Sequence, residues 1–152
     1  MAGKSVIVDT NALLLPGEFG VDIFAELGRL GYVHAIIPRA VVSELERLSG
    51  NPSATGRDRR AAALGLSVLE QVIRTPDSGG IQVSIAAPAD EGEGTGAGGA
   101  EAAGDTDALI VALAVREKAA VLTNDEALRK TLARAGIVTI YLRGGARLEE
   151  RG

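Results

Sequence analysis

Two aspartates stand at the start of an apolar, helix-forming segment, GDTDALIVALA, at residues 104–114. Short polar residues are the preferred N-caps of helices, and acids in a first turn are stabilised by the helix dipole by about 0.3–1 kcal/mol. Taken alone, the segment favours a capping role for Asp105 and Asp107. A role in metal binding depends on acidic residues elsewhere in the chain.

Three further acids lie near the ends of predicted strands. Asp9 directly follows the β-branched segment KSVIV, and Asp125 follows the segment AVLT after one asparagine. Glu44 lies about two turns into the helix predicted after the strand YVHAIIP. Ligands of an open parallel sheet bind at the carboxyl ends of its strands. We therefore expect these acids to meet at one edge of the sheet.

Carboxylates that share a pocket are unfavourable without a bound cation, because each negative charge raises the pKa of its neighbours. Helix capping explains Asp105 or Asp107, and also Asp125, but it does not explain Glu44 or the convergence of all these acids. Mg²⁺ and Mn²⁺ prefer oxygen ligands, keep several waters and also bind phosphate oxygens of a substrate. The pattern therefore predicts a site for Mg²⁺ or Mn²⁺.

The composition is typical of a globular protein with one domain. The chain has 152 residues, a hydrophobic content of 46% and a net charge of −4. It has no cysteine and one histidine, which excludes disulfides and thiol nucleophiles and leaves oxygen ligands for a metal. No apolar run approaches the roughly 20 residues of a membrane span, and no signal-peptide core is present. We expect a cytoplasmic location without membrane partners.

The elements that must position the acids alternate between strand and helix. Short β-branched runs predict five strands, at residues 4–8, 32–38, 81–85, 120–123 and 137–142. Apolar residues at helical spacing predict helices between them, at residues 21–30, 40–48, 59–73, 105–118 and 125–136. This alternation predicts an α/β fold, a three-layer α/β/α sandwich with a central parallel sheet of about five strands.

One domain is expected over residues 1–143, followed by a polar C-terminal tail at residues 144–152. A Gly- and Glu-rich segment at residues 86–104 is interpreted as a flexible loop within the domain. Only about 48 residues follow this segment, which is too few for a second domain. The loop enters the acidic edge at Asp105, so it is either a solvated linker or a lid over a bound substrate.

Four segments, in order, resemble the successive motifs of the PIN-domain nucleases: VIVDTNALL, IPRAVVSELERL, GDTDALIVALA and VLTNDEALRKTL. The match spans nearly the whole chain. On that pattern Asp9, Glu44, Asp107 and Asp125 match the four catalytic, metal-binding acids. Asp105 matches an additional acid that some members carry.

The resemblance also implies a mechanism and a set of supporting residues. Asn11, Thr123 and Asn124 match polar residues that support the acids. One or two Mg²⁺ or Mn²⁺ ions would lower the pKa of a bound water and stabilise charge on the scissile phosphate. The implied activity is that of a metal-dependent endoribonuclease that cuts RNA, leaving a 5′-phosphate and a 3′-hydroxyl.

Several alternatives remain open at this point. The segments TGRDRRAAALGLSVLE and IVTIYLR look most like the archaeal branch close to the rRNA-processing Fcf1-like proteins, and the toxin branch is the near alternative. A homodimer, an antitoxin and a ribosome-assembly partner are open as partners. A catalytically silent PIN-like module would bind RNA or protein instead. A haloacid-dehalogenase-like phosphatase is more remote, because Asn11 stands where that family has its second acid.

Basic residues near the predicted acidic edge are candidate RNA contacts. Arg57 and Arg60 precede or begin the long helix, and Arg129 lies one helical turn beyond Asp125, within reach of a bound phosphate. A solvated helix face is the alternative for each of them. Aromatic residues make up only 3% of the chain, so recognition of the RNA backbone is favoured over base stacking.

Overall fold

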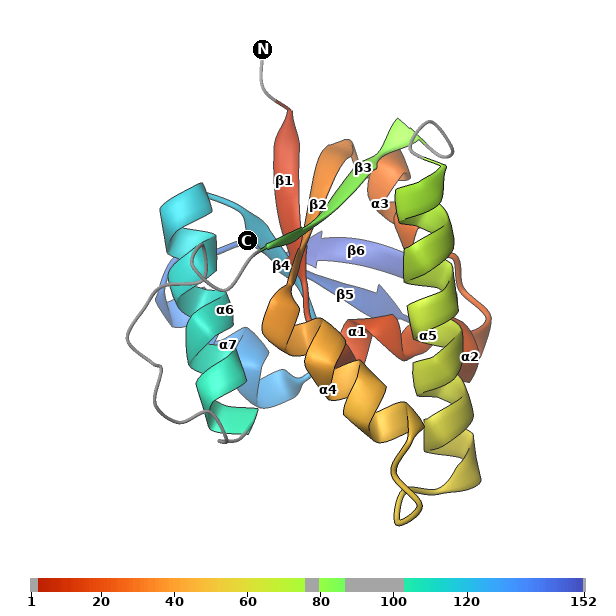
Figure 1. Cartoon of the computed structure of the whole chain (residues 1–152). Helices are drawn as coiled ribbons and strands as arrows, with labels where there is room; N and C mark the ends of the chain where they lie inside the picture. The colour runs from red at the N-terminus through yellow and green to blue at the C-terminus, as the bar shows by residue number, and fades with distance from the viewer. Residues whose placement is uncertain (1–2, 76–79, 87–102, 152) are drawn as a thin grey trace.

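The structure, a computed structural model, describes residues 3–75, 80–86 and 103–151, with only the backbone described for residues 103–105. Its centre is a six-stranded sheet of strand order β3-β2-β1-β4-β5-β6 (Figure 1). The strands are β1 (Lys4–Val8), β2 (Tyr32–Pro38), β3 (Gln82–Ala86), β4 (Ala120–Leu122), β5 (Thr139–Arg143) and β6 (Arg147–Arg151). The first five are parallel, and β6 pairs antiparallel with β5 at the edge.

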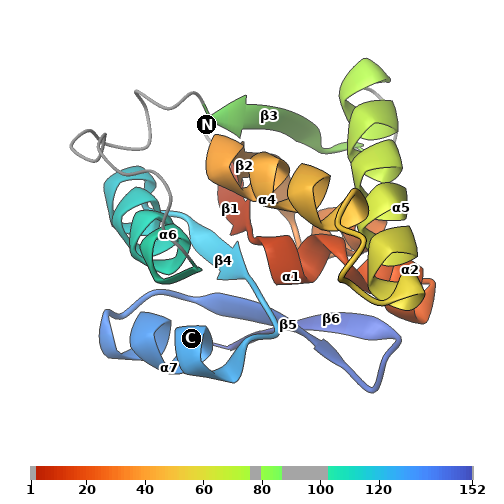
Figure 2. The same cartoon turned by 60° about the horizontal axis from the view of Figure 1, so that its bottom comes forward.

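Helices cover both faces of this sheet, so the predicted three-layer α/β/α architecture is confirmed. They are α1 (Thr10–Leu13), α2 (Leu15–Phe19), α3 (Ile23–Arg29), α4 (Arg39–Ser49), α5 (Gly56–Arg74), α6 (Ala103–Glu117) and α7 (Glu126–Arg134). Figures 1 and 2 show α6 and α7 on one side of the sheet, and α3, α4 and α5 on the other. The central residues Val6, Ile7 and Val8 are 0% exposed, as expected for a strand covered on both faces.

α3 and α5 begin at side-chain caps that the sequence supplies. Asp22 accepts a hydrogen bond from the backbone N–H of Ala25 at the start of α3, and Thr55 accepts one from that of Asp58 at the start of α5. Such caps satisfy donors that the first turn of a helix leaves without partners. Among the described residues no helix is long and apolar enough to cross a membrane.

α1 and α2 form in a segment for which the sequence predicts no helix, and α5 packs closely against them. A Cβ atom added at Gly65 of α5 would lie 2.3 Å from the backbone oxygen of Leu13, and one added at Gly17 would lie 2.7 Å from Ala61 Cα. These two glycines therefore allow α5 to pack closely against α1 and α2. Asp9 directly precedes α1 and caps it, because its side chain accepts a hydrogen bond from the N–H of Ala12.

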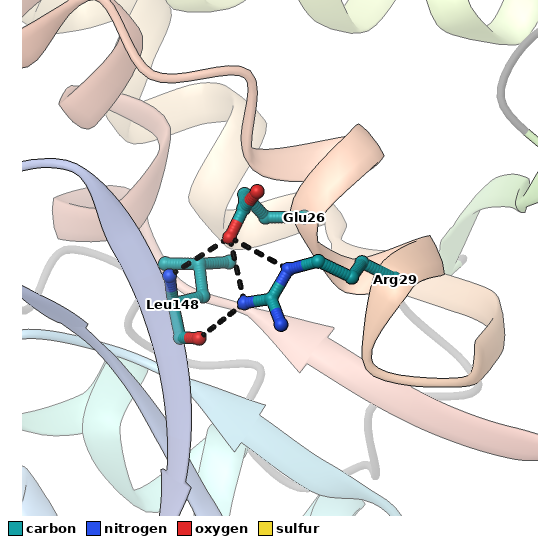
Figure 3. A network of polar contacts seen from close by, with 3 residues as sticks. All are labelled: Glu26, Arg29 and Leu148. Atoms are coloured by element: carbon teal, nitrogen blue, oxygen red, sulfur yellow. Dashed lines mark hydrogen bonds and ion pairs between the residues drawn. The ribbon is translucent and has the colours of Figure 1, made fainter.

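β6 corrects the expectation of a polar tail at residues 144–152, because residues 147–151 form a strand. Gly144 and Gly145 adopt positive φ angles of 66° and 72° and turn the chain back from β5 into β6. Figure 3 shows how α3 holds the outer edge of this strand. Glu26 Oε1 accepts a hydrogen bond of 3.2 Å from the N–H of Leu148, and Arg29 Nη2 donates one of 3.0 Å to its carbonyl oxygen. The N–H and the carbonyl oxygen of Leu148, on the edge strand, thereby both have hydrogen-bond partners.

Most of the predicted loop at residues 86–104 lies outside the described residues. Its ends do not belong to a loop, because Ala86 is the last residue of β3 and residues 103–104 begin α6. The interpretation of the segment as a linker or a lid therefore stays a prediction.

Candidate active site

Four of the predicted acids line one pocket of about 270 Å³, which we call the acidic pocket. They are Asp9 after β1, Glu44 on α4, Asp107 on α6 and Asp125 before α7. Figure 2 shows these helices, together with α1, grouped around the ends of β1 and β4. The pocket thus lies at the carboxyl ends of parallel strands, where open α/β sheets bind ligands.

Asp9 is the most deeply placed acid of the acidic pocket, with 5% of its surface exposed. Its Oδ1 accepts a 2.8 Å hydrogen bond from the backbone N–H of Ala12, and the Thr123 side chain also bonds to it. Burial raises the pKa of Asp9 to about 7, against the lowering effect of these two hydrogen bonds. The negative charges of Asp107 and Asp125 make a smaller contribution to the same increase in pKa. A neighbouring cation would favour the ionised form of the Asp9 carboxylate.

Asp107 is electrostatically coupled to the other acids. Its pKa is raised by burial first, then by the charges of Asp125 and Glu44. The residue lies within α6 rather than at the helix start, so capping, the local alternative for this segment, does not account for it. Asp125 both lines the acidic pocket and caps α7, because its Oδ1 accepts a 3.1 Å hydrogen bond from the N–H of Leu128.

Thr10 belongs to the acidic pocket although it was not predicted as a site residue. Its hydroxyl donates a 2.7 Å hydrogen bond to Glu44 Oε1 and so ties α4 to the start of α1. The available signal was its place in the DTN triplet directly after Asp9. A threonine there does not reveal its partner, since Glu44 is 34 positions away.

The three predicted supporting residues connect the ends of β1, β4 and β5. Asn11 Oδ1 accepts a 3.2 Å hydrogen bond from the N–H of Asn124, and Asn124 Oδ1 accepts one of 2.7 Å from that of Leu142. Thr123 Oγ1 accepts one of 3.0 Å from the N–H of Asp125. These contacts fix the turn that carries Asp125 relative to the strand that carries Asp9.

The acidic pocket offers oxygen donors only, which suits Mg²⁺ or Mn²⁺ rather than a softer metal. Within the described residues no three Asp, Glu, His or Cys side chains are grouped closely enough to hold a metal ion. The side chain of Asp105, the fifth predicted ligand, lies outside them. A cation that keeps several waters needs only one or two carboxylates directly, so the donor set fits such an ion in its chemistry.

The predicted basic contacts do not line the acidic pocket. The guanidinium of Arg129 lies over the Tyr141 ring, 4.4 Å from its centroid, and lines a different pocket. Arg57 and Arg60 are exposed in the first turn or two of α5. Arg59 has a structural role, since its Nη1 donates to backbone oxygens of the preceding loop, including that of Ala54 at 2.6 Å.

Fold and site together define a class, an α/β/α domain with a carboxylate-lined pocket at the carboxyl ends of its parallel strands. The family model described as a PIN-like domain matches residues 6–93 and 95–145. The chain therefore belongs to the PIN-like domain family, and the family resemblance is confirmed. PIN-like domains form a nuclease superfamily, which favours the nuclease interpretation over the phosphatase.

A solved structure supports the same fold. It is a domain of a functionally unknown protein from Methanocaldococcus jannaschii DSM 2661, which is 24% identical in sequence with a TM-score of 0.61. The match covers 93% of this chain and 92% of that chain. A search of curated proteins finds no match.

Proposed function

We propose that the protein is a Mg²⁺- or Mn²⁺-dependent endoribonuclease that hydrolyses RNA phosphodiester bonds at the acidic pocket. The observation that carries the proposal is the convergence of Asp9, Glu44, Asp107 and Asp125 from four separate connections on one pocket. Stability alone does not explain this arrangement, because the neighbouring carboxylates raise the pKa of Asp9 and of Asp107. Membership of the PIN-like family supports the same activity.

The four acids would hold one or two divalent ions, with Asp105 as a further ligand. Such an ion supplies a bound water of lowered pKa and positive charge beside the scissile phosphate. Asp9 is held rigidly by its hydrogen bonds to Ala12 and Thr123, and Glu44 is held by Thr10. No side chain of the pocket has to act as the nucleophile.

The role we assign to this activity is processing of ribosomal RNA. It is based on the resemblance of residues 55–70 and 137–143 to the archaeal branch. The toxin alternative predicts growth arrest when the protein is expressed without a protein inhibitor. Normal growth together with altered ribosomal RNA ends on deletion of the gene would support the processing role.

The activity is tested with labelled single-stranded and structured RNA in Mn²⁺ and in EDTA. We expect the parent protein to cleave RNA in Mn²⁺ and not in EDTA. Asp9→Asn should cleave at least about a hundredfold more slowly than the parent in Mn²⁺. Asp22→Asn is the matched control, since Asp22 is an exposed helix cap outside the acidic pocket. A parent protein that binds RNA without cutting it would instead support the silent module.

A further inference from the structure

A second pocket, of about 520 Å³, lies between α7 and the strands β5 and β6. We call it the basic pocket, because Arg129, Lys130 and Arg151 line it with Glu126 as its acidic residue. None of these residues lines the acidic pocket. The nuclease chemistry proposed above therefore leaves the basic pocket without a role.

The charge of this region is opposite to that of the chain as a whole. Residues 126–151 contain six basic and three acidic residues, a net charge of +3 in a chain of net charge −4. Arg143 is paired with Glu149. The side chains of Lys130 and Arg151 have no hydrogen bond or ion pair with any residue that the structure describes. Unpaired cations in a pocket favour an anionic ligand.

Arg129 is held in place by an aromatic ring. Its guanidinium lies 4.4 Å from the centroid of Tyr141, which is half-buried on β5. A stacked guanidinium keeps its planar set of donors, which matches the oxygens of a phosphate. Because Arg129 is already ordered, less conformational entropy is lost when it binds a phosphate.

The linings of the acidic pocket and the basic pocket are adjacent in the chain at the start of α7. Asp125 lines the acidic pocket directly before α7, and Arg129 follows one turn later. The backbone N–H of Arg129 donates a 2.9 Å hydrogen bond to the backbone carbonyl oxygen of Asp125. Four residues of helix advance about 6 Å along the axis. Stacked nucleotides of one strand advance by about 3.4 Å each along the helix axis. A strand cut at the acidic pocket would therefore reach Arg129 within about one or two nucleotides.

We propose that Arg129, Lys130 and Arg151 bind the phosphate backbone of single-stranded RNA on one side of the acidic pocket. The position of the cut relative to this contact rests on the proposed nuclease function, whereas the binding itself needs no metal. Tyr141 is a positioning residue, since it acts by ordering Arg129.

Binding is measured by fluorescence anisotropy of a short labelled single-stranded RNA in EDTA, over a series of salt concentrations. The double variant Lys130→Ala with Arg151→Ala should bind about tenfold or more weakly at low salt. Its plot of log affinity against log salt should be shallower by about 0.7 for each phosphate that the protein no longer neutralises. Arg74→Ala, which removes one exposed charge on α5, should bind like the parent. A double variant that also binds like the parent would overturn the proposal.

Two substitutions of Tyr141 test the ordering of Arg129 without changing the charge. Tyr141→Phe keeps the ring and should bind RNA like the parent. Tyr141→Leu should bind more weakly while its salt slope stays near that of the parent, because every cation is still present. Equal binding by Tyr141→Leu would overturn the positioning role. Thermal unfolding of both variants identifies any loss of folding.

The failure of this proposal and that of the nuclease proposal give different results. If the parent does not cleave RNA, but its binding in EDTA depends on Lys130 and Arg151, the basic pocket stands and the nuclease proposal falls. If the parent cleaves RNA and its affinity does not depend on these residues, the basic pocket falls. Competition by duplex RNA as strong as that by the single strand would overturn the assignment to single strands.

Discussion

Thr10 connects two elements of the acidic pocket, because it follows Asp9 in the chain and donates its hydroxyl hydrogen to Glu44. Thr10→Val removes this bond at nearly constant volume. We expect Mn²⁺ affinity, measured by calorimetric titration, to fall by about 10- to 100-fold, as for other residues that orient a ligand. Thr10→Ser keeps the hydroxyl and should restore the affinity. An unchanged affinity in Thr10→Val would show that Glu44 needs no such support.

The raised pKa of Asp9 predicts that the stability of the metal-free protein depends on pH. Its pKa is about 7 in the folded chain against an ordinary value of 3.8, so the folded state binds more protons between these pH values. The free energy of unfolding in EDTA should therefore fall as the pH rises from about 4 to about 7. Denaturant unfolding of the parent and Asp9→Asn at several pH values checks this. The same slope in both proteins would contradict the raised pKa.

At the scale of elements, the close contact between α5 and α1 predicts that adding a single methyl group at Gly65 lowers the stability of the protein. Gly65→Ala gains about 1 kcal/mol of helix propensity, but its Cβ would lie 2.3 Å from the backbone oxygen of Leu13. We expect a net loss of about 1–3 kcal/mol in denaturant unfolding, because the backbone of α1 has to move. Ser67→Ala, at an exposed position of α5, is the control and should be neutral or slightly stabilising. An unchanged stability in Gly65→Ala would mean that the packing of α5 on α1 is loose.

The main elements could be predicted from the sequence because their signals are local. Strands such as residues 4–8 are short β-branched runs, and the long helix at residues 56–74 has apolar residues at helical spacing. β6 could not be predicted in this way, because its charged sequence forms a strand only against β5 and the side chains of Glu26 and Arg29. The Gly-Gly pair at residues 144–145 was the one local sign of a hairpin.

The acidic pocket was predictable to a similar extent. The acids could be placed together because Asp9 and Asp125 follow strand ends, and Glu44 and Asp107 lie in the first two turns of helices that come after strands. The contact from Thr10 to Glu44 and the stacking of Arg129 on Tyr141 depend on side-chain geometry between distant segments. Arg129 was therefore predicted beside the acids, whereas its side chain lines the basic pocket.

At the scale of the whole molecule, the repulsion among the acids should make stability depend on metal. In EDTA, Asp107→Ala should be as stable as the parent or more stable, because one negative charge of the cluster is removed. At a Mn²⁺ concentration of a hundred times Kd the parent should gain about 2.7 kcal/mol, and the variant much less. Thermal unfolding of both proteins with and without Mn²⁺ measures this reversal.

Asp22→Ala is the control for this reversal, since Asp22 is a helix cap remote from the cluster. It should lose about 1 kcal/mol with or without metal. A loss of the same kind in Asp107→Ala, independent of Mn²⁺, would assign Asp107 to helix stability and not to a metal site.

Two acids on α4 provide the most direct test of the central claim, that the acidic pocket cleaves RNA. Glu44 lines this pocket, whereas Glu46, two residues away on the same helix, is exposed and lines a different surface. The measurement is the single-turnover rate of RNA cleavage in Mn²⁺ for Glu44→Gln and Glu46→Gln. We predict a loss of at least about a hundredfold for Glu44→Gln and the parent rate for Glu46→Gln. Equal rates in the two variants would contradict the account.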